Sequence, residues 1–236
     1  MKTRLVMSWS GGKDSAVALQ QLLRSDEYEV VALMTSVAEE YRRVSHHGVR
    51  EELLDAQAEA IGIRLEKVYL PSGCSNAVYE QILAGALARL RANGVEAVGY
   101  GDLFLEDIRA YREATLARAG LRGVFPIWQR NTAELAEEVI RSGYRAYISC
   151  VEGAVGQAFA RRLYNHEFLA QLPESVDPCG ERGEFHSFVF DGPIFRHAVA
   201  VEVGEVVPRD GRFYADLLAP SSARTAQPLA ELMPPV

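Results

Sequence analysis

The chain has 236 residues, of which 48 % are hydrophobic and 24 % charged, as in an ordinary globular domain. This composition excludes a disordered chain or a collagen-like fibre. The longest apolar runs, such as residues 30–34, fall far short of the ~20 residues that a membrane span needs. The formal net charge of −7 disfavours nucleic acid as a partner, because binders of nucleic acid need a cationic surface.

The cysteines and the N-terminal sequence indicate a cytoplasmic protein. The three cysteines (Cys74, Cys150 and Cys179) are far apart and contain no CxxC pair, so neither a zinc site nor an iron–sulfur site is suggested. This usage of cysteine favours a reducing compartment. The apolar N-terminal stretch is interrupted from Gly11 on and carries no signal-peptide cleavage region. We therefore expect a cytoplasmic location and no membrane partner.

Residues 1–128 alternate between short apolar runs and amphipathic stretches. The apolar runs predict strands at residues 5–8, 29–35, 64–70 and 96–101. The amphipathic stretches predict helices at residues 14–24, 50–61, 76–92 and 105–119. Such alternation is typical of βαβ units, so the predicted fold class is α/β, with a doubly wound, mostly parallel sheet covered on both faces.

After residue 128 the pattern changes. We expect helices at residues 132–141 and around 158–169, and strands at 145–149, 185–190, 197–207 and 212–218. This mixture predicts a smaller C-terminal α+β domain. The expected division is an α/β domain at residues 1–128, an α+β domain at 129–222 and a loose, proline-containing tail at 223–236.

The clearest motif lies between the first predicted strand and the first predicted helix and consists of Ser10, Gly11, Gly12, Lys13, Asp14 and Ser15. A loop at this junction directs several backbone N–H groups at one point, and the helix dipole adds positive potential there. The glycines allow close approach of an anion. The loop is not a Walker A motif, because Met7 stands where that motif needs a glycine. It is either a pyrophosphate cradle or a tight turn with a serine cap.

An acid beside a phosphate site repels the phosphate unless a divalent cation lies between them. Asp14 is therefore expected to contact Mg²⁺. The motif resembles the PP-loop of the N-type ATP pyrophosphatases, the adenine nucleotide alpha hydrolase-like superfamily, which cleave ATP between the α- and β-phosphates. That resemblance implies a PP-loop ATPase type of fold. The residues expected to contact the nucleotide are Ser8, Ser10, Gly11, Gly12, Lys13, Asp14, Ser15, Met34 and Gly101.

Further segments resemble the diphthine–ammonia ligase family, over roughly residues 4–200. They are His47-Gly48 with Gln57-Ala58, the strand end at Gly101-Asp102, residues 177–186 (DPCGERGEFH) and Asp191-Gly192-Pro193. The family enzyme uses ATP and ammonium to amidate the carboxylate of diphthine on translation elongation factor 2. His186-Ser187 stands where archaeal and eukaryotic members tend to have Glu-Thr, which is similar to a bacterial-type branch. In that branch the acceptor would be different and unknown.

Five residues are expected to be catalytic: Lys13, Asp102, Arg112, Glu181 and Glu184. Lys13 would stabilise the departing pyrophosphate. The two glutamates would bind or deprotonate ammonium, and the alternative for them is a turn with solvated acids. Asp102 could instead cap the following helix, and Arg112, with Arg109, could lie on a salt-bridged face. Whether Cys179 and His47 are functional or structural stays open.

The predicted function is that of an ATP-dependent carbon–nitrogen ligase. It would adenylate a carboxylate, form an amide with ammonia and release AMP and pyrophosphate. The expected cofactors are ATP and Mg²⁺, and the acceptor carboxylate would be on a protein or a small molecule. A homo-oligomer is possible. The alternatives are a PP-loop tRNA thiolase, which the charge disfavours, and a non-catalytic protein that binds adenine nucleotides.

Overall fold

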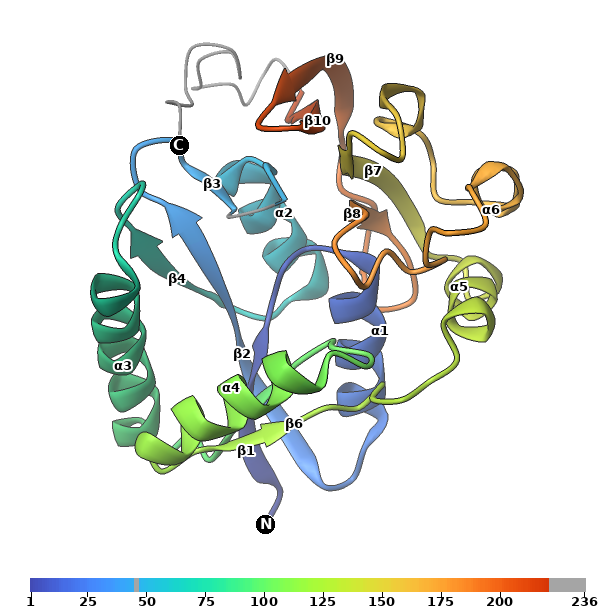
Figure 1. Ribbon diagram of the computed structural model, residues 1–236. Helices are drawn as coiled ribbons and strands as arrows, with labels where there is room; N and C mark the ends of the chain where they lie inside the picture. Colours follow the sequence, from blue (N-terminus) through green and yellow to red (C-terminus); the bar gives the residue numbers. More distant parts are fainter. Residues whose placement is uncertain (45–46, 221–236) are drawn as a thin grey trace.

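The computed structural model describes residues 1–44 and 47–220 (Figure 1), and the tail expected at 223–236 lies outside them. The N-terminal sheet contains five parallel strands in the order β4 (Leu65–Leu70), β2 (Tyr28–Ala38), β1 (Thr3–Ser8), β5 (Ala97–Gly99) and β6 (Arg122–Val124). The short β3 (Arg43–Val44) pairs antiparallel with the end of β2. The predicted mostly parallel α/β fold is confirmed.

Four helices cover the two faces of this sheet. Leu5 and Met7 of β1 belong to the same buried cluster as apolar residues of α1 (Lys13–Arg24) and α2 (Glu51–Ile61). Val6, between them, belongs to a second cluster with residues of α3 (Asn76–Ala92) and α4 (Glu106–Arg118). Successive side chains of a strand point to opposite faces, so β1 is buried on both sides. This double burial explains why its sequence is continuously apolar.

The C-terminal half contributes an antiparallel sheet in the order β8 (Phe185–Asp191), β7 (Arg145–Glu152), β10 (Arg212–Leu218) and β9 (Glu202–Arg209). It also contains α5 (Thr132–Arg141), the short 3₁₀ helix η1 (Gln157–Phe159) and α6 (His166–Gln171). Its buried Ile148 and Phe188 belong to the same apolar cluster as Leu5 and Val17. Figure 1 shows β8 running beside α1. The two halves therefore share one core, which brings β8 against the loop at the start of α1.

Two predicted elements of this half are partly wrong. The helix expected around 158–169 is split into η1 and α6, because residues 161 and 162 instead form backbone hydrogen bonds with Ile148 of β7. The strand expected at 197–207 begins only at Glu202, since the chain before it turns at Gly192 and is tied back by Val199 N–H to Phe190 O. Within the described residues, no helix combines the length and the apolarity needed to cross a membrane.

Candidate active site

The loop of residues 10–15, hereafter the PP-loop, leaves β1 at Ser8 and enters α1 at Lys13. Its turn depends on Gly11, which has φ +78°, and a Cβ at Gly11 would lie 2.8 Å from Gln57 Oε1. Gly12 is the N-cap residue of α1, with no side-chain cap. The Gly12 N–H donates to Ser10 Oγ at 3.2 Å, and Ser15 Oγ donates to Gly12 O at 2.8 Å. The two serines therefore stabilise the loop itself, and the N-cap residue of α1 supplies no side-chain cap.

Gln57 of α2 fixes this loop to the second sheet. It is fully buried, accepts from Trp9 Nε1 at 2.9 Å and donates to Gly11 O at 3.0 Å and to Val189 O at 2.5 Å. Val189 N–H donates to the same Gly11 carbonyl at 2.9 Å. Two residues earlier on the same strand, β8, Ser187 Oγ accepts from the Lys13 N–H at 3.1 Å. The pair Gln57-Ala58 was identified by its resemblance to the family, but the bridging role of Gln57 was not predicted. It joins segments that are 132 residues apart in the sequence.

Lys13 is buried, and its side chain points into the C-terminal half. Its Nζ donates to the carbonyl of Cys179, forms an ion pair with Asp14 Oδ2 at 2.9 Å and lies 5.2 Å from the Phe185 ring centroid. Burial lowers the pKa of Lys13, but the charges around it, Asp14 first, outweigh this and raise the pKa overall. Lys13 therefore joins the PP-loop to the segment 177–184, hereafter the CGE segment.

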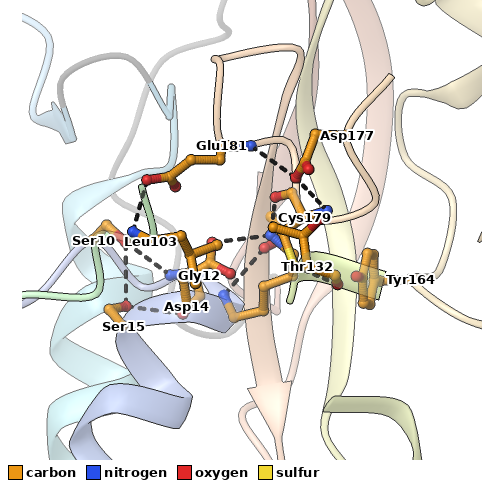
Figure 2. Close-up of polar contacts among 12 residues, drawn as sticks. Ser10, Gly12, Asp14, Ser15, Leu103, Thr132, Tyr164, Asp177, Cys179 and Glu181 are labelled. Atoms are coloured by element: carbon orange, nitrogen blue, oxygen red, sulfur yellow. Dashed lines mark hydrogen bonds and ion pairs between the residues drawn. The ribbon is translucent and has the colours of Figure 1, made fainter. Parts of the chain in front are cut away.

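The CGE segment is an ordered turn held by its own polar groups (Figure 2). Asp177 Oδ1 accepts from the N–H groups of Cys179 at 2.8 Å and Glu181 at 3.4 Å. Cys179 Sγ donates to Thr132 O at 3.3 Å, and burial raises the pKa of its thiol to about 12. A thiol that stays protonated is a poor nucleophile. The geometry therefore favours a structural role for Cys179.

The two glutamates of the CGE segment have different surroundings. Glu181 Oε1 accepts from Leu103 N–H at 2.7 Å and Phe104 N–H at 3.4 Å, which brings this carboxylate to the loop between β5 and α4. Figure 2 shows the contact with Leu103. Burial, with the nearby charges of Asp14 and Asp102, raises the pKa of Glu181 to about 7. Glu184 instead accepts from Asp177 N–H at 3.1 Å and Arg182 N–H at 3.0 Å, inside its own segment. Of these two glutamates, only Glu181 reaches toward the sheet edge that carries the PP-loop.

The end of β5 packs closely on the start of α1. A Cβ on Gly101 would lie 2.8 Å from Asp14 C and Ser15 N, so only glycine fits there. The next residue, Asp102, forms an ion pair with Arg112, with Oδ2 to Nε at 2.7 Å. Burial raises the pKa of Asp102, and Arg112 offsets part of this rise. The N-cap position of α4 is occupied by Leu105, so the capping alternative for Asp102 is wrong.

Arg112 and Arg109 take different partners. Arg112 is 32 % exposed, pairs with Asp102 and lies 4.3 Å from the Tyr100 ring centroid. Arg109 pairs with Glu113 at 2.9 Å, one turn along α4. The salt-bridged face expected as an alternative therefore applies to Arg109. Arg112 carries its guanidinium to the sheet edge that holds the PP-loop.

Asp14 is the described side chain best suited to Mg²⁺. Its Oδ1 is buried and has no hydrogen-bond partner, while burial raises the pKa of the carboxyl group. An orphaned carboxylate oxygen at a phosphate loop fits a hard cation. No group of three or more His, Cys, Asp or Glu suited to a metal occurs among the described residues.

The remaining predicted contacts lie around the first two strands. Ser8 is half-buried at the end of β1 and is paired in register with Met34 of β2. Met34 is buried in the core, and its carbonyl accepts from Trp9 N–H at 2.7 Å. His47 lies beside the PP-loop, with its Cε1 3.5 Å from the position of a Cβ on Gly12. Its ring centroid is 4.3 Å from that of His186.

Comparisons with known proteins bear on the family. The diphthamide synthase N-terminal domain matches residues 1–123, and the diphthamide synthase C-terminal domain matches residues 131–215. A diphthine–ammonia ligase of Mus musculus is 27 % identical over 240 residues, covering 89 % of this chain and 86 % of that protein. The corresponding protein of Danio rerio is 26 % identical, covering 86 % and 88 %.

A solved U34-tRNA thiolase from Methanococcus maripaludis is 19 % identical, covers 59 % of this chain and 56 % of its own, and has a TM-score of 0.35. A similarity this distant supports no conclusion about the activity. The two domain matches follow one another along the sequence and together span most of it. The predicted family is confirmed: the chain belongs to the diphthamide synthase family.

Proposed function

We propose that this protein is an ATP-dependent ligase of the diphthine–ammonia ligase type, which activates a carboxylate as its adenylate and joins it to ammonia, releasing AMP and pyrophosphate. The observation that carries the proposal is the contact of the CGE segment with the PP-loop and the end of β5. Lys13 holds the Cys179 carbonyl, and Leu103 N–H holds Glu181. An acid whose pKa is about 7 is thereby fixed beside a phosphate-binding loop.

The PP-loop would bind the phosphates of ATP through backbone N–H groups at the start of α1. Asp14 would hold Mg²⁺ through its unpartnered Oδ1, and the bound ion would neutralise phosphate charge. Lys13 was expected to reach the departing pyrophosphate, but its Nζ is engaged by Cys179 and Asp14. We assign it the role of holding the CGE segment against the loop.

Glu181 is the candidate general base. With a pKa of about 7 it is partly ionised at neutral pH, which suits proton transfer there. Its carboxylate would take one proton from ammonium. The ammonia so formed would attack the carbonyl carbon of the activated carboxylate and form the C–N bond, and AMP would leave with the electrons of the broken C–O bond. The proton that the new amide nitrogen loses would pass to water. Glu184, bound within its own segment, would keep the turn rigid.

Arg112 is the candidate group for orienting the acceptor. A guanidinium binds a carboxylate through a planar fork of N–H groups, and Arg112 keeps part of its surface exposed while Asp102 fixes its position. The names of the relatives point to an acceptor of the diphthine type. The proposed acceptor is therefore diphthine or another carboxylate, on a protein or a small molecule. A homo-oligomer and a cytoplasmic location belong to the same proposal.

The test is an amidation assay on the full chain with ATP, Mg²⁺, ¹⁵N-ammonium and a panel of carboxylates that includes diphthine on elongation factor 2. We expect AMP, pyrophosphate and a ¹⁵N-amide in equal amounts with one of these acceptors, and turnover to these products about 100-fold slower in Glu181→Gln. The matched control is Glu174→Gln, an exposed acid seven residues earlier. Formation of ADP and phosphate in place of AMP would overturn the proposal.

A further inference from the structure

Three side chains that the proposed reaction leaves without a role form a continuous row beside the PP-loop. His47 Cε1 lies 3.5 Å from the position of a Cβ on Gly12, and its ring is 4.3 Å from the ring of His186. Arg212 Nη1 lies 3.4 Å from His186 Nε2. We call His47, His186 and Arg212 the imidazole row. The row begins beside Gly12 of the PP-loop and continues to strands β8 and β10 of the second sheet.

The loop that carries His47 is fixed to the second sheet by several contacts. Gly48 has φ +67°, and a Cβ there would lie 2.6 Å from the ring of Tyr214, two residues from Arg212 on β10. Arg43 is 2 % exposed and donates to Gly48 O at 2.8 Å and to Asp216 Oδ1 at 3.1 Å. A group held this firmly by buried partners is preorganised for a ligand.

The chemistry of the row suits an anion. Because a guanidinium can only donate, His186 Nε2 accepts from Arg212, and the ring proton of His186 is then on Nδ1. Arg212 also pairs with Glu152 at 3.0 Å, a carboxylate whose side chain is 39 % exposed. Imidazole N–H and guanidinium groups are strong donors to phosphate oxygens. Two stacked imidazoles beside a guanidinium would gain most from a ligand of high negative charge.

Three other side chains at the PP-loop are acids. We call Asp14, Asp102 and Glu181 the acid group; the charges of Asp14 and Asp102 both raise the pKa of Glu181. A pyrophosphate group is repelled by Asp102 and Glu181, to which the proposed function gives no metal, and is attracted by the imidazole row. A nucleotide bound at this loop therefore has a favoured direction, with its terminal phosphates toward the row.

We propose that His47, His186 and Arg212 form a subsite for the β- and γ-phosphates of ATP and for the pyrophosphate that leaves. The row thereby directs the α-phosphate toward the acid group. This inference rests on the proposed function, since it takes the PP-loop to be the site of ATP. It adds three phosphate-binding residues from the β3–α2 loop and the second sheet to a site otherwise built by the N-terminal sheet.

The test is calorimetric titration of the full chain, with Mg²⁺, using inorganic pyrophosphate, α,β-methylene ATP and AMP. We expect His186→Gln and Arg212→Gln each to weaken pyrophosphate and the ATP analogue about tenfold, the scale of one charge-assisted hydrogen bond, with AMP unchanged. Arg212→Lys, which keeps the charge, should recover most of the affinity. The matched controls are His197→Gln, on the exposed segment before β9, and Arg145→Gln, whose side chain is 60 % exposed.

The outcomes separate the two proposals. If the wild-type chain binds the ATP analogue and pyrophosphate but the row variants bind both as tightly, the subsite is wrong and the proposed function stands. An equal loss of AMP affinity in both variants, unrelieved by Arg212→Lys, would make the row a structural support and also overturn the subsite. A wild-type chain that binds none of the three ligands would overturn the proposed function and the subsite together.

Discussion

The acid group and the imidazole row adjoin the same loop of six residues, yet they are built in different ways. The acid group is drawn from the first turn of α1, the end of β5 and the CGE segment, and burial raises the pKa of each of its carboxyl groups. The row comes from the β3–α2 loop and from β8 and β10. Placing carboxylates and imidazoles on separate elements gives the phosphate site a polarity, and that polarity assigns proton transfer and phosphate binding to separate places.

The strongest challenge to the acid group is Asp14→Asn. The change removes the orphaned Oδ1 charge proposed to hold Mg²⁺ and leaves an amide of the same size. We expect AMP formation to fall about 1000-fold, the upper range for one lost electrostatic contact to the reacting groups. Rates of AMP release at saturating Mg²⁺ measure this. Asp26→Asn, at an exposed site, is the control. If Asp14→Asn released AMP as fast as Asp26→Asn, Asp14 would not belong to the site.

Glu181→Gln tests the base itself. We expect turnover to fall about 100-fold, the usual contribution of a general base. In the wild type the rate should rise as the pH increases through about 7, because the carboxylate form is the active one. The variant should lack this rise, whereas Glu174→Gln should keep it. A variant with the wild-type pH profile would show that another group takes the proton.

The same substitution has a stability consequence of known sign. Because burial raises the pKa of Glu181 above its unfolded value, its contribution to folding is full at low pH and is lost as the pH rises through about 7. A glutamine can still accept from Leu103 N–H and has no charge to bury. The unfolding free energy of Glu181→Gln relative to wild type should therefore be higher at pH 8 than at pH 5 in denaturant titrations. The opposite order would place Glu181 in a more polar environment.

Gln57→Leu tests whether the acid group and the imidazole row both depend on the buried amide of Gln57, which joins the PP-loop to β8. The variant loses the donors and the acceptor that join Trp9, Gly11 and Val189. Leaving these buried groups unpaired should cost about 2 kcal/mol, a factor of about 30 in the folding equilibrium. Urea denaturation measures it, with Gln81→Leu on the exposed side of α3 as the control. An unchanged midpoint would mean that the loop and β8 hold their positions without Gln57.

Much of the fold could be predicted because local signals mark its elements. The bounds of α3 and α5 match the prediction, and each helix begins at a side-chain cap, Ser75 and Asn131. The strands β3 and β6, which have only two and three residues, were not predicted. Runs this short carry no periodicity. Their pairing depends on the neighbouring strands of the sheet.

The site could be predicted only in part, for a related reason. The PP-loop and the CGE segment were identified because their residues are adjacent in sequence. Which of their side chains meet could not be read from spacing, since Lys13 and Cys179 are 166 residues apart. The same holds for the pairing of His47 with His186. Contacts at such distances follow from the shared core that brings β8 to α1, which no local pattern encodes.

Arg112→Gln is expected to have the smallest effect and sharpens the division between phosphate and acceptor. Loss of the guanidinium should raise the KM for the carboxylate acceptor about tenfold, as for one lost charge-assisted contact, with little change in ATP affinity. Asp102 would lose the partner that offsets its burial, so its pKa should rise further. Arg112→Lys should rescue only part of the KM, because an ammonium lacks the planar fork. Arg109→Gln, one turn earlier and paired with Glu113, is the control. An equal rise in the acceptor KM in both variants would mean that the acceptor responds to the overall charge of α4 and not to a contact with Arg112.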